Sequence, residues 1–240
     1  MSEKLAQREG NKEVRRAMLT AIREHLDASA PFDRVRAEHH SHHGAAEVSR
    51  RADVIVSESG ATPVERFKEM LEAVGGHVAI VRDEREAGEM LSQIIEQTKA
   101  RRIALSDSPT VQSLMKYVRA DAELLQSASA AALFDCDIGI TGAQWAIAET
   151  GTLVLAHDEE RHRLTSLVPT VHVALVVAEQ VLATLGEVLQ ALDRMGPERL
   201  SRTVTFITGP SRTSDIELTL AIGVHGPAEL FVIIVEGETL

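Results

Sequence analysis

Short apolar runs alternate with amphipathic segments along the chain from residue 62 onwards. The runs are continuously aliphatic, as in the strands of a parallel sheet that is covered on both faces. The amphipathic segments have the spacing of about 3.6 residues that is typical of helices packing one face on such a sheet. We therefore expect an α/β fold with a mixed, mostly parallel sheet flanked by helices. The expected strands cover residues 77–81, 103–105, 137–141, 171–177, 203–207 and 230–235.

The strongest helix signal covers residues 62–76. Residues 62–65, Thr-Pro-Val-Glu, combine a capping box with a proline at the first helical position. Apolar side chains then recur on one face until the pair Gly75-Gly76 ends the helix. Further helices are expected over residues 86–100, 109–118 and 179–195.

An antiparallel hairpin is also expected. Two apolar runs, residues 145–148 and 153–155, flank the short turn Glu149-Thr150-Gly151. Apolar runs separated by a glycine-containing turn of this length are typical of hairpins. This element is the reason for expecting a mixed sheet.

The first 60 residues have a different character. Residues 3–26 have apolar positions four apart and predict one amphipathic helix. Residues 28–60 hold few large apolar side chains and predict a flexible linker, which includes a histidine run within residues 39–43. Neutral imidazole is a good metal ligand, so a metal-binding or regulatory module built on this run is an alternative. No shell of carboxylates or thiols is arranged around the run, so the favoured expectation is no metal site. The predicted organisation is an N-terminal segment, residues 1–60, and one α/β domain, residues 61–240.

The charge balance bears on possible partners. The chain carries 25 basic and 36 acidic side chains, a formal charge of −11. Such an acidic chain repels phosphate backbones over most of its surface. Basic residues near the N-terminus are interspersed with glutamates, which is typical of a helix face in water. We therefore expect no nucleic acid among the partners. Aromatic residues are only 3% of the chain, so the core must be aliphatic.

Cys136 is the only cysteine. An intrachain disulfide is impossible, which fits a reducing compartment. Iron–sulfur clusters usually have about four cysteine ligands, so this chain cannot build one by itself. Beside an apolar run, Cys136 is expected to be a small buried residue rather than a nucleophile. The sequence shows neither a secretory signal nor an apolar stretch of about 20 residues, so the expected location is the cytoplasm, without membrane insertion.

Three glycine-rich polar segments adjoin the expected strands. They cover residues 141–152, 161–172 and 209–227. Loops at strand ends carry function disproportionately often. Because ligands of open α/β sheets bind outside the carboxyl ends of the strands, we expect the three segments to meet at one such rim.

The motifs in these segments resemble the signature of the LUD (lactate utilisation) family, and specifically its lactate-utilisation protein C branch. The resemblance spans residues 62–235. Arg212 stands where a lysine is expected, a departure that keeps the positive charge. The motifs are Ala-Glu-Thr-Gly-Thr at 148–152, Ser-Leu-Val-Pro at 166–169, Gly-Pro-Ser-Arg-Thr-Ser-Asp-Ile-Glu at 209–217 and Gly-Val-His-Gly-Pro at 223–227.

The resemblance implies a fold similar to the sugar-phosphate isomerase, CoA-transferase and formyltetrahydrofolate cyclo-ligase superfamily. It also implies a subunit of a complex that oxidises L-lactate to pyruvate, in which iron–sulfur partner subunits carry the clusters. This chain would then hold no cofactor itself, in keeping with its single cysteine. The alternative is a stand-alone enzyme that acts on a small anionic or CoA-linked metabolite through Glu149.

Two residues are candidates for catalysis. Glu149 lies in a Glu-x-Gly turn similar to the one in which related CoA transferases place a nucleophilic glutamate, although a solvated turn glutamate is the simpler interpretation. His225 lies in a glycine-rich loop and is the better acid–base candidate, because imidazole titrates near neutrality. His172, between two valines of an expected strand, is interpreted as a buried structural histidine. A stand-alone enzyme would need Glu149, Ser211 and His225 in one pocket.

The candidates for ligand binding come from the same polar segments. Ser214 and Glu217 form a second capping box, which predicts a helix whose free N–H groups attract an anion, or which is merely capped there. Arg163 either holds a carboxylate or pairs with the acidic residues just before it. The candidate ligand-binding residues are Thr150, Gly151, Arg163, Ser166, Gly209, Ser211, Arg212, Thr213, Asp215 and Glu217.

Overall fold

The computed structural model describes residues 19–20, 60–126, 128–156, 163–195, 201, 203–214 and 220–237. Contacts between Cα atoms separate residues 57–240 from the preceding part of the chain, and the fold is that of this second unit. Leu19 and Thr20 are helical, within the helix expected over residues 3–26. The rest of that expected helix, almost all of the expected linker and the histidine run lie outside the described residues.

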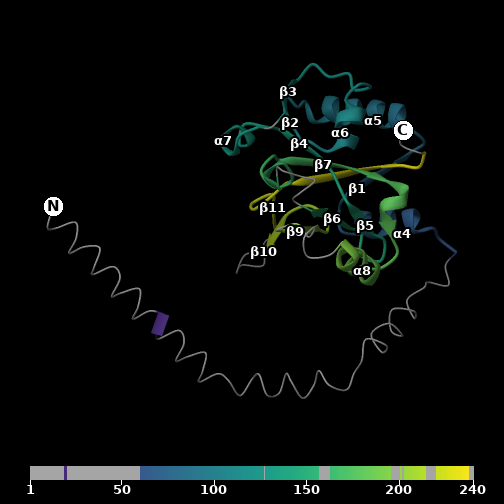
Figure 1. Ribbon diagram of the computed structural model, residues 1–240. Helices are drawn as coiled ribbons and strands as arrows, with labels where there is room; N and C mark the ends of the chain where they lie inside the picture. The colour runs from purple at the N-terminus through teal and green to yellow at the C-terminus, as the bar shows by residue number, and fades with distance from the viewer. Residues whose placement is uncertain are drawn as a thin grey trace, which may run out of the picture. The chain divides into compact units, whose positions relative to one another are not determined.

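Six strands form a central sheet in which every neighbouring pair is parallel (Figure 1). The spatial order is β1-β12-β7-β4-β2-β3. Five of the strands were expected from their aliphatic runs. The sixth, β3, was not expected, because this edge strand is largely exposed and lacks a long aliphatic run. The strands are β1 (His77–Val81), β2 (Arg102–Leu105), β3 (Glu123–Gln126), β4 (Ile138–Gly142), β7 (Val171–Val177) and β12 (Glu229–Val235).

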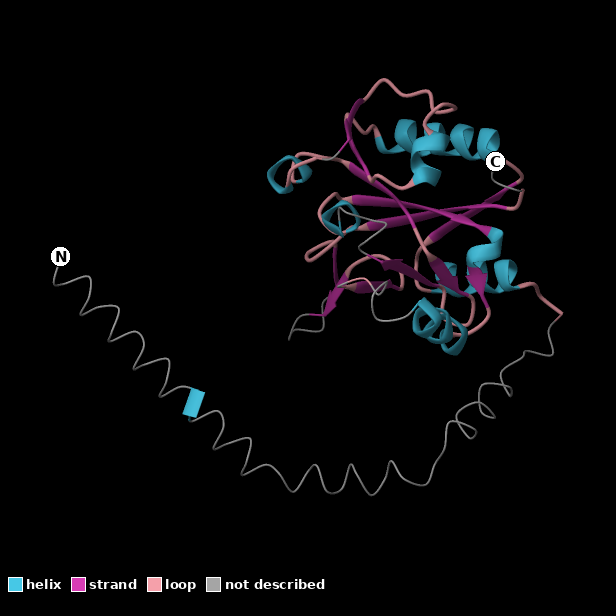
Figure 2. Ribbon diagram, viewed as in Figure 1, coloured by secondary structure: helices cyan, strands magenta, loops and turns pink. Residues whose placement is uncertain are grey.

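Helices α5 (Glu84–Thr98) and α6 (Pro109–Leu114) cover one face of the central sheet (Figure 2). The side chain of Asp83 accepts a hydrogen bond from the backbone N–H of Glu86, so α5 begins two residues before the expected start. The apolar stripe of α5 then packs on the aliphatic side chains of the strands. The buried side chains at this interface include Ala87, Leu91, Ile94, Ile95, Ile103, Ile138, Ile140 and Val173.

A second sheet packs on the opposite face of the central sheet. Its strand order is β8-β5-β6-β9, with β5 (Trp145–Ile147), β6 (Thr152–Ala156), β8 (Val181–Leu182) and β9 (Val204–Ile207). Strands β5 and β6 form the expected antiparallel hairpin. The predicted α/β class is confirmed, with the difference that the antiparallel pairs, including the expected hairpin, lie outside the central sheet, which is fully parallel.

Helix α4 (Pro63–Ala73) completes the core on this face. The capping box of Thr62 and Glu65 is present as expected. Phe67 and Leu71 of α4 are fully buried in a cluster with side chains of both sheets. Figure 1 shows α8 (Leu185–Met195) on the far side of the second sheet, where Val188 packs in a cluster with side chains of β5 and β6.

Helix α8 begins later than the pattern predicts. A helix was expected from residue 179, but a 3-10 turn, η2 (Ala178–Gln180), is followed by β8. Val181 and Leu182 of β8 pair with Ala146 and Ile147 of β5. The first of the periodic apolar positions therefore lie in a short edge strand and the rest lie in a helix. Helical spacing alone does not show where the strand ends and the helix begins.

Candidate functional site

A cavity of about 230 Å³ lies between the two sheets. His172 and Leu230, from β7 and β12, belong to the central sheet, and residues 205–207 belong to β9 of the second sheet. Residues 166–167 and the loops 208–211 and 225–227 supply the rest of the lining. Four candidate residues are therefore brought to one cavity, namely Ser166, Gly209, Ser211 and His225.

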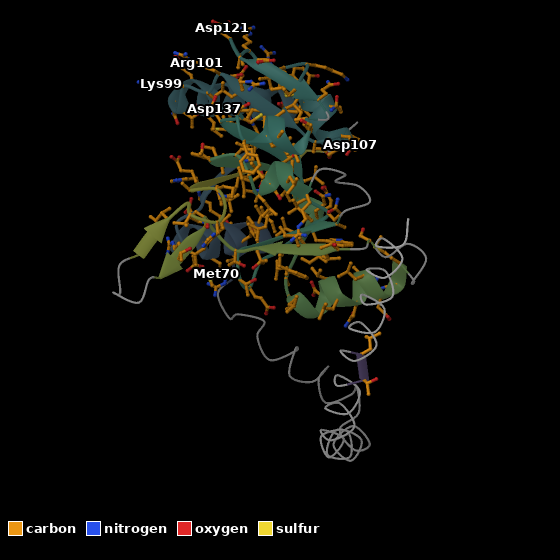
Figure 3. The ribbon with its side chains drawn as sticks, turned by 90° about the vertical axis from the view of Figure 1, so that its left-hand side faces the viewer. Met70, Lys99, Arg101, Asp107, Asp121 and Asp137 are labelled. Carbon is orange, nitrogen blue, oxygen red and sulfur yellow. The ribbon has the colours of Figure 1, made fainter. Side chains whose placement is uncertain are left out.

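The cavity lies at the amino ends of the central strands. His172 and Leu230 are the second residues of β7 and β12, and the lining loops precede those strands. Figure 3 shows both ends of the sheet, with Asp137 just before β4 on one side and Asp107 just after β2 on the other. The expectation of a common carboxyl-end rim is therefore wrong for two of the three polar segments, because residues 161–172 and 209–227 lead into the central strands β7 and β12.

His172 is a buried polar side chain in the lining of this cavity. It is only 1% exposed, which confirms the interpretation as a buried histidine. Its Nε2 lies 2.8 Å from Oγ1 of Thr141 on the neighbouring strand β4. Its Nδ1 is buried and has no hydrogen-bond partner among the described residues. Burial lowers the pKa of His172 to about 4, so the ring is neutral at neutral pH.

Gly139 allows the chain to approach the sheet beside His172. The two residues are paired across β4 and β7. A Cβ atom at position 139 would overlap the carbonyl oxygen of Thr165, in the 3-10 turn η1 (Arg163–Ser166). The absent side chain therefore lets η1 lie directly on the sheet. This contact buries Ser166, whose hydroxyl donates to the carbonyl of Arg163 at 2.9 Å.

Backbone hydrogen bonds hold the two glycine-rich loops of the cavity together. The N–H of Ser211 donates to the carbonyl of Pro227 at 2.8 Å, and the N–H of Gly223 donates to the carbonyl of Ser211 at 3.0 Å. Between the loops, β10 (Arg212–Ser214) and β11 (Leu220–Ile222) pair as an antiparallel ladder. This pairing brings Ser211 and His225 to the same cavity from separate motifs.

The helix expected to follow Ser214 lies on residues 215–219, which are outside the described residues. Ser214 is the last residue of β10 and pairs with Leu220 of β11. Asp215 and Glu217 lie outside the described residues. The anion site expected at this helix start therefore stays a prediction.

Glu149 has a partner elsewhere. Its Oε1 accepts a hydrogen bond from the backbone N–H of Leu185, the first residue of α8, at 2.6 Å. Its own backbone N–H donates to the carbonyl of Ala183 at 3.1 Å. Glu149 is not among the described residues that line the cavity. The stand-alone-enzyme hypothesis needs Glu149, Ser211 and His225 in one pocket, and this cavity is lined by only the last two of them.

The neighbours of Glu149 in the turn have packing roles. The hydroxyl of Thr150 lies 2.7 Å from that of Thr152, which lies 2.7 Å from that of Thr208 in the cavity lining. Gly151 has a φ of +63°, and a Cβ atom there would overlap the backbone nitrogen of Leu71 in α4. Only glycine combines this φ with such a close approach at low cost.

Three further candidates lie away from the cavity lining. Arg163 is exposed, and Thr213 is a half-buried residue of β10. The guanidinium of Arg212 lies against Gly75, just after the end of α4. A positive charge is favourable there, because the carbonyl end of a helix carries partial negative charge.

Thr208 and Leu230 line the cavity but were not predicted from the sequence as site residues. In the sequence, Leu230 resembles any other aliphatic residue of a buried strand, and Thr208 carries no motif signal that sets it apart from other strand-end threonines.

Within the part of the chain that the structure describes, no group of three or more His, Cys, Asp or Glu side chains is placed to hold a metal ion. No helix in that same part is long and apolar enough to cross a membrane.

The fold and the cavity define an α/β protein with a small pocket between two stacked sheets. The LUD domain family matches residues 64–235, well over half of the chain, and the chain belongs to this family.

Several curated relatives are similar over part of their length. Lactate utilization protein C of Halalkalibacterium halodurans is 39% identical over 102 residues, which cover 42% of this chain and 44% of the relative. The protein of the same name from Deinococcus radiodurans is 41% identical over 108 residues, which cover 45% of this chain and 50% of the relative. The matched part thus spans about half the length of these relatives.

A solved structure supports the fold. The crystal structure of a DUF162 family protein from Deinococcus radiodurans superposes with a TM-score of 0.56 at 23% identity. The superposition covers 72% of this chain and 96% of that protein. At this identity the similarity shows the shared fold alone.

Proposed function

We propose that this protein takes part in lactate utilisation, as a subunit that binds a small metabolite in the cavity between its sheets. The observation that carries the proposal is the convergence of separate motif segments, since residues 166–167, 209–211 and 225–227 line one cavity. Relatives named Lactate utilization protein C indicate the class of metabolite. The cavity of about 230 Å³ is smaller than the sites of about 300–1,000 Å³ that take drug-sized ligands, and it suits a three-carbon acid.

We propose further that the reaction is oxidation of L-lactate to pyruvate in the cytoplasm, with iron–sulfur clusters bound by partner subunits. The residues of this chain do not fit a cluster. Its one cysteine, Cys136, is 5% exposed, and its thiol donates to the carbonyl of Ala132 at 3.3 Å. Burial raises the pKa of Cys136, which disfavours the thiolate that ligates iron. Clusters in such a complex would belong to other subunits.

The geometry gives little support to a stand-alone enzyme that uses Glu149 as a nucleophile. A carboxylate nucleophile must be free to reach its substrate. The Glu149 carboxylate instead accepts a hydrogen bond from the first residue of α8 and lies outside the lining of the cavity. We therefore favour the subunit hypothesis.

Growth on lactate tests the proposed role. Deletion of the gene is expected to prevent growth on L-lactate as the sole carbon source while leaving growth on pyruvate unchanged, because pyruvate enters metabolism after the missing step. Expression of the intact chain should restore growth. Normal growth of the deletion strain on L-lactate would contradict the proposal.

Copurification tests the proposed partners. A tagged chain isolated from lactate-grown cells is expected to bring down cysteine-rich subunits, and the visible absorption of iron–sulfur clusters should follow those subunits when the complex is dissociated. The chain purified alone should be colourless and inactive on L-lactate with an artificial electron acceptor. Cluster absorption or lactate oxidation by the isolated chain would exclude the assignment of clusters to partners.

A further inference from the structure

The buried ring of His172 has a polar atom without a protein partner. Nε2 is satisfied by Thr141, but Nδ1 has no partner among the described residues. A buried polar atom left without a hydrogen bond is unfavourable, and nearly all such atoms in folded proteins have partners. His172 also lines the cavity between the sheets. The missing partner of Nδ1 is therefore expected to be a molecule in that cavity.

The chemical character of the cavity restricts what this molecule is. Most of the lining is apolar, including Leu167, Phe206 and Leu230, and polar groups such as Ser211 and His225 belong to the loops. Neither lysine nor arginine is among the described residues of the lining. A buried charge without a counter-charge is strongly unfavourable, so the end of the ligand beside His172 must be neutral. A charged end is better placed near the exposed His225 and the half-buried Ser211.

We propose that this cavity binds a short-chain hydroxy acid whose hydroxyl group forms a hydrogen bond with Nδ1 of His172. The carboxylate then lies on the side of Ser211 and His225, and the carbon chain packs against Leu230. This inference rests on the proposed function for the metabolite class and adds the residue and the group that recognise it. It makes His172 a ligand-binding residue and not only a structural one.

A hydroxyl group is the partner that suits this ring in both of its neutral forms. If Nε2 carries the proton and donates to Thr141, Nδ1 is an acceptor and needs a donor. If Thr141 donates to Nε2, Nδ1 carries the proton and needs an acceptor. A hydroxyl both donates and accepts, so it pairs with Nδ1 in either case. The same molecule without its hydroxyl leaves Nδ1 unpaired, and sites built around such a hydrogen bond discriminate strongly.

Two probes that differ only in the hydroxyl group test the proposal, namely L-lactate and propanoate. We expect calorimetric titration of the purified chain to show propanoate binding about tenfold more weakly, the effect of one lost hydrogen bond. With ¹⁵N-labelled histidine, L-lactate should shift the imidazole nitrogen signals of His172, and propanoate should shift them far less. Equal affinities, no binding of L-lactate, or unshifted His172 signals would each overturn the proposal.

A matched pair of substitutions locates the effect. In H172F the ring remains aromatic but loses both nitrogens, so L-lactate is expected to bind as weakly as propanoate does. The control is H77F, the same substitution at an exposed histidine that stacks on Phe231 and does not line the cavity. It should bind both probes like the unmodified chain. Loss of discrimination in H77F alone would contradict the assignment.

The binding titrations test the site independently of the growth experiment that tests the proposed function. The ¹⁵N titration uses the unmodified chain, so it decides the question even if H172F does not fold. If growth on lactate depends on the gene but L-lactate leaves His172 unshifted, the role in lactate utilisation stands and the site assignment fails. If L-lactate binds at His172 but growth does not depend on the gene, the site stands and the proposed role fails.

Discussion

The carboxylate of Glu149 accepts a hydrogen bond from the backbone N–H of Leu185 at 2.6 Å and so supports the first turn of α8. Thr184 accepts from the N–H of Glu187 in the same turn, so two side chains share the free N–H groups of this helix start. Replacing Glu149 with alanine removes one acceptor and a negative charge from the positive end of the helix. We expect E149A to lower the free energy of unfolding by about 1 kcal/mol, measured by urea denaturation.

The control for this prediction is E179A, which removes an exposed glutamate from the 3-10 turn before β8. It should leave the free energy of unfolding nearly unchanged. E149A should still restore growth on lactate, because its effect is on stability. A folded E149A protein that fails to restore growth would revive the hypothesis of a catalytic Glu149.

Local sequence signals predicted much of the fold. The capping box at Thr62 acts within three residues, so the sequence alone marks the start of α4. The central strands are marked by their continuous aliphatic composition, although their pairing partners lie far away in the chain. Short or edge elements were missed for the opposite reason. The two residues of β8 are specified by pairing with β5, more than 30 residues earlier in the chain.

The site was predicted only in part, for a similar reason. Ser211 and His225 belong to glycine-rich motifs and do share the cavity. Glu149 was grouped with them because of its motif, yet its hydrogen-bond partner lies 36 residues away, where no local pattern points to it. The unpaired Nδ1 of His172 is likewise invisible in sequence, since it depends on what the neighbouring strand offers to the ring.

The single cysteine should be protected in the folded protein. Cys136 is buried, its thiol bonds to the carbonyl of Ala132, and burial raises its pKa. We expect a chromogenic thiol reagent at neutral pH to react with it slowly, and to release one equivalent of product rapidly once urea unfolds the chain. Adding free cysteine to the same sample controls for reagent activity. Fast reaction of the native protein would show that Cys136 is accessible.

The pH dependence of stability should carry the signature of His172. Its pKa is lowered by burial from 6.5 to about 4 in the folded protein. Between these two values the unfolded chain binds a proton that the folded protein does not bind, so the free energy of unfolding falls as the pH is lowered. Over the whole interval the fall from this residue amounts to about 3 kcal/mol. From about one pH unit above 6.5, where the unfolded histidine is also neutral, the residue contributes almost no pH dependence.

Urea unfolding at several pH values from neutral to about 4 measures this slope, since the folded pKa sets the lower end of the window. In H172F the contribution of His172 is absent, so the slope should be shallower than that of the unmodified chain. The variant H225A, which removes an exposed histidine, should retain the slope. An equal slope in H172F and the unmodified chain would mean that the ring titrates normally in the folded protein.

The close approach of η1 to the sheet should make position 139 intolerant of any side chain. A Cβ atom in G139A would overlap the carbonyl oxygen of Thr165, so η1 must move away from β4, where Gly139 pairs with His172 of β7. Overpacking of this kind lowers the free energy of unfolding by about 1–3 kcal/mol.

The matched control is G186A in α8, where the nearest atom to the added Cβ, Oγ1 of Thr184, is 3.6 Å away. In a helix that change is expected to be neutral or to raise stability by up to about 1 kcal/mol. Urea denaturation of both variants measures the difference, and displacement of Ser166 from the cavity should also weaken binding of L-lactate in G139A but not in G186A. Equal stability of the two variants would show that η1 does not rest on the sheet at Gly139.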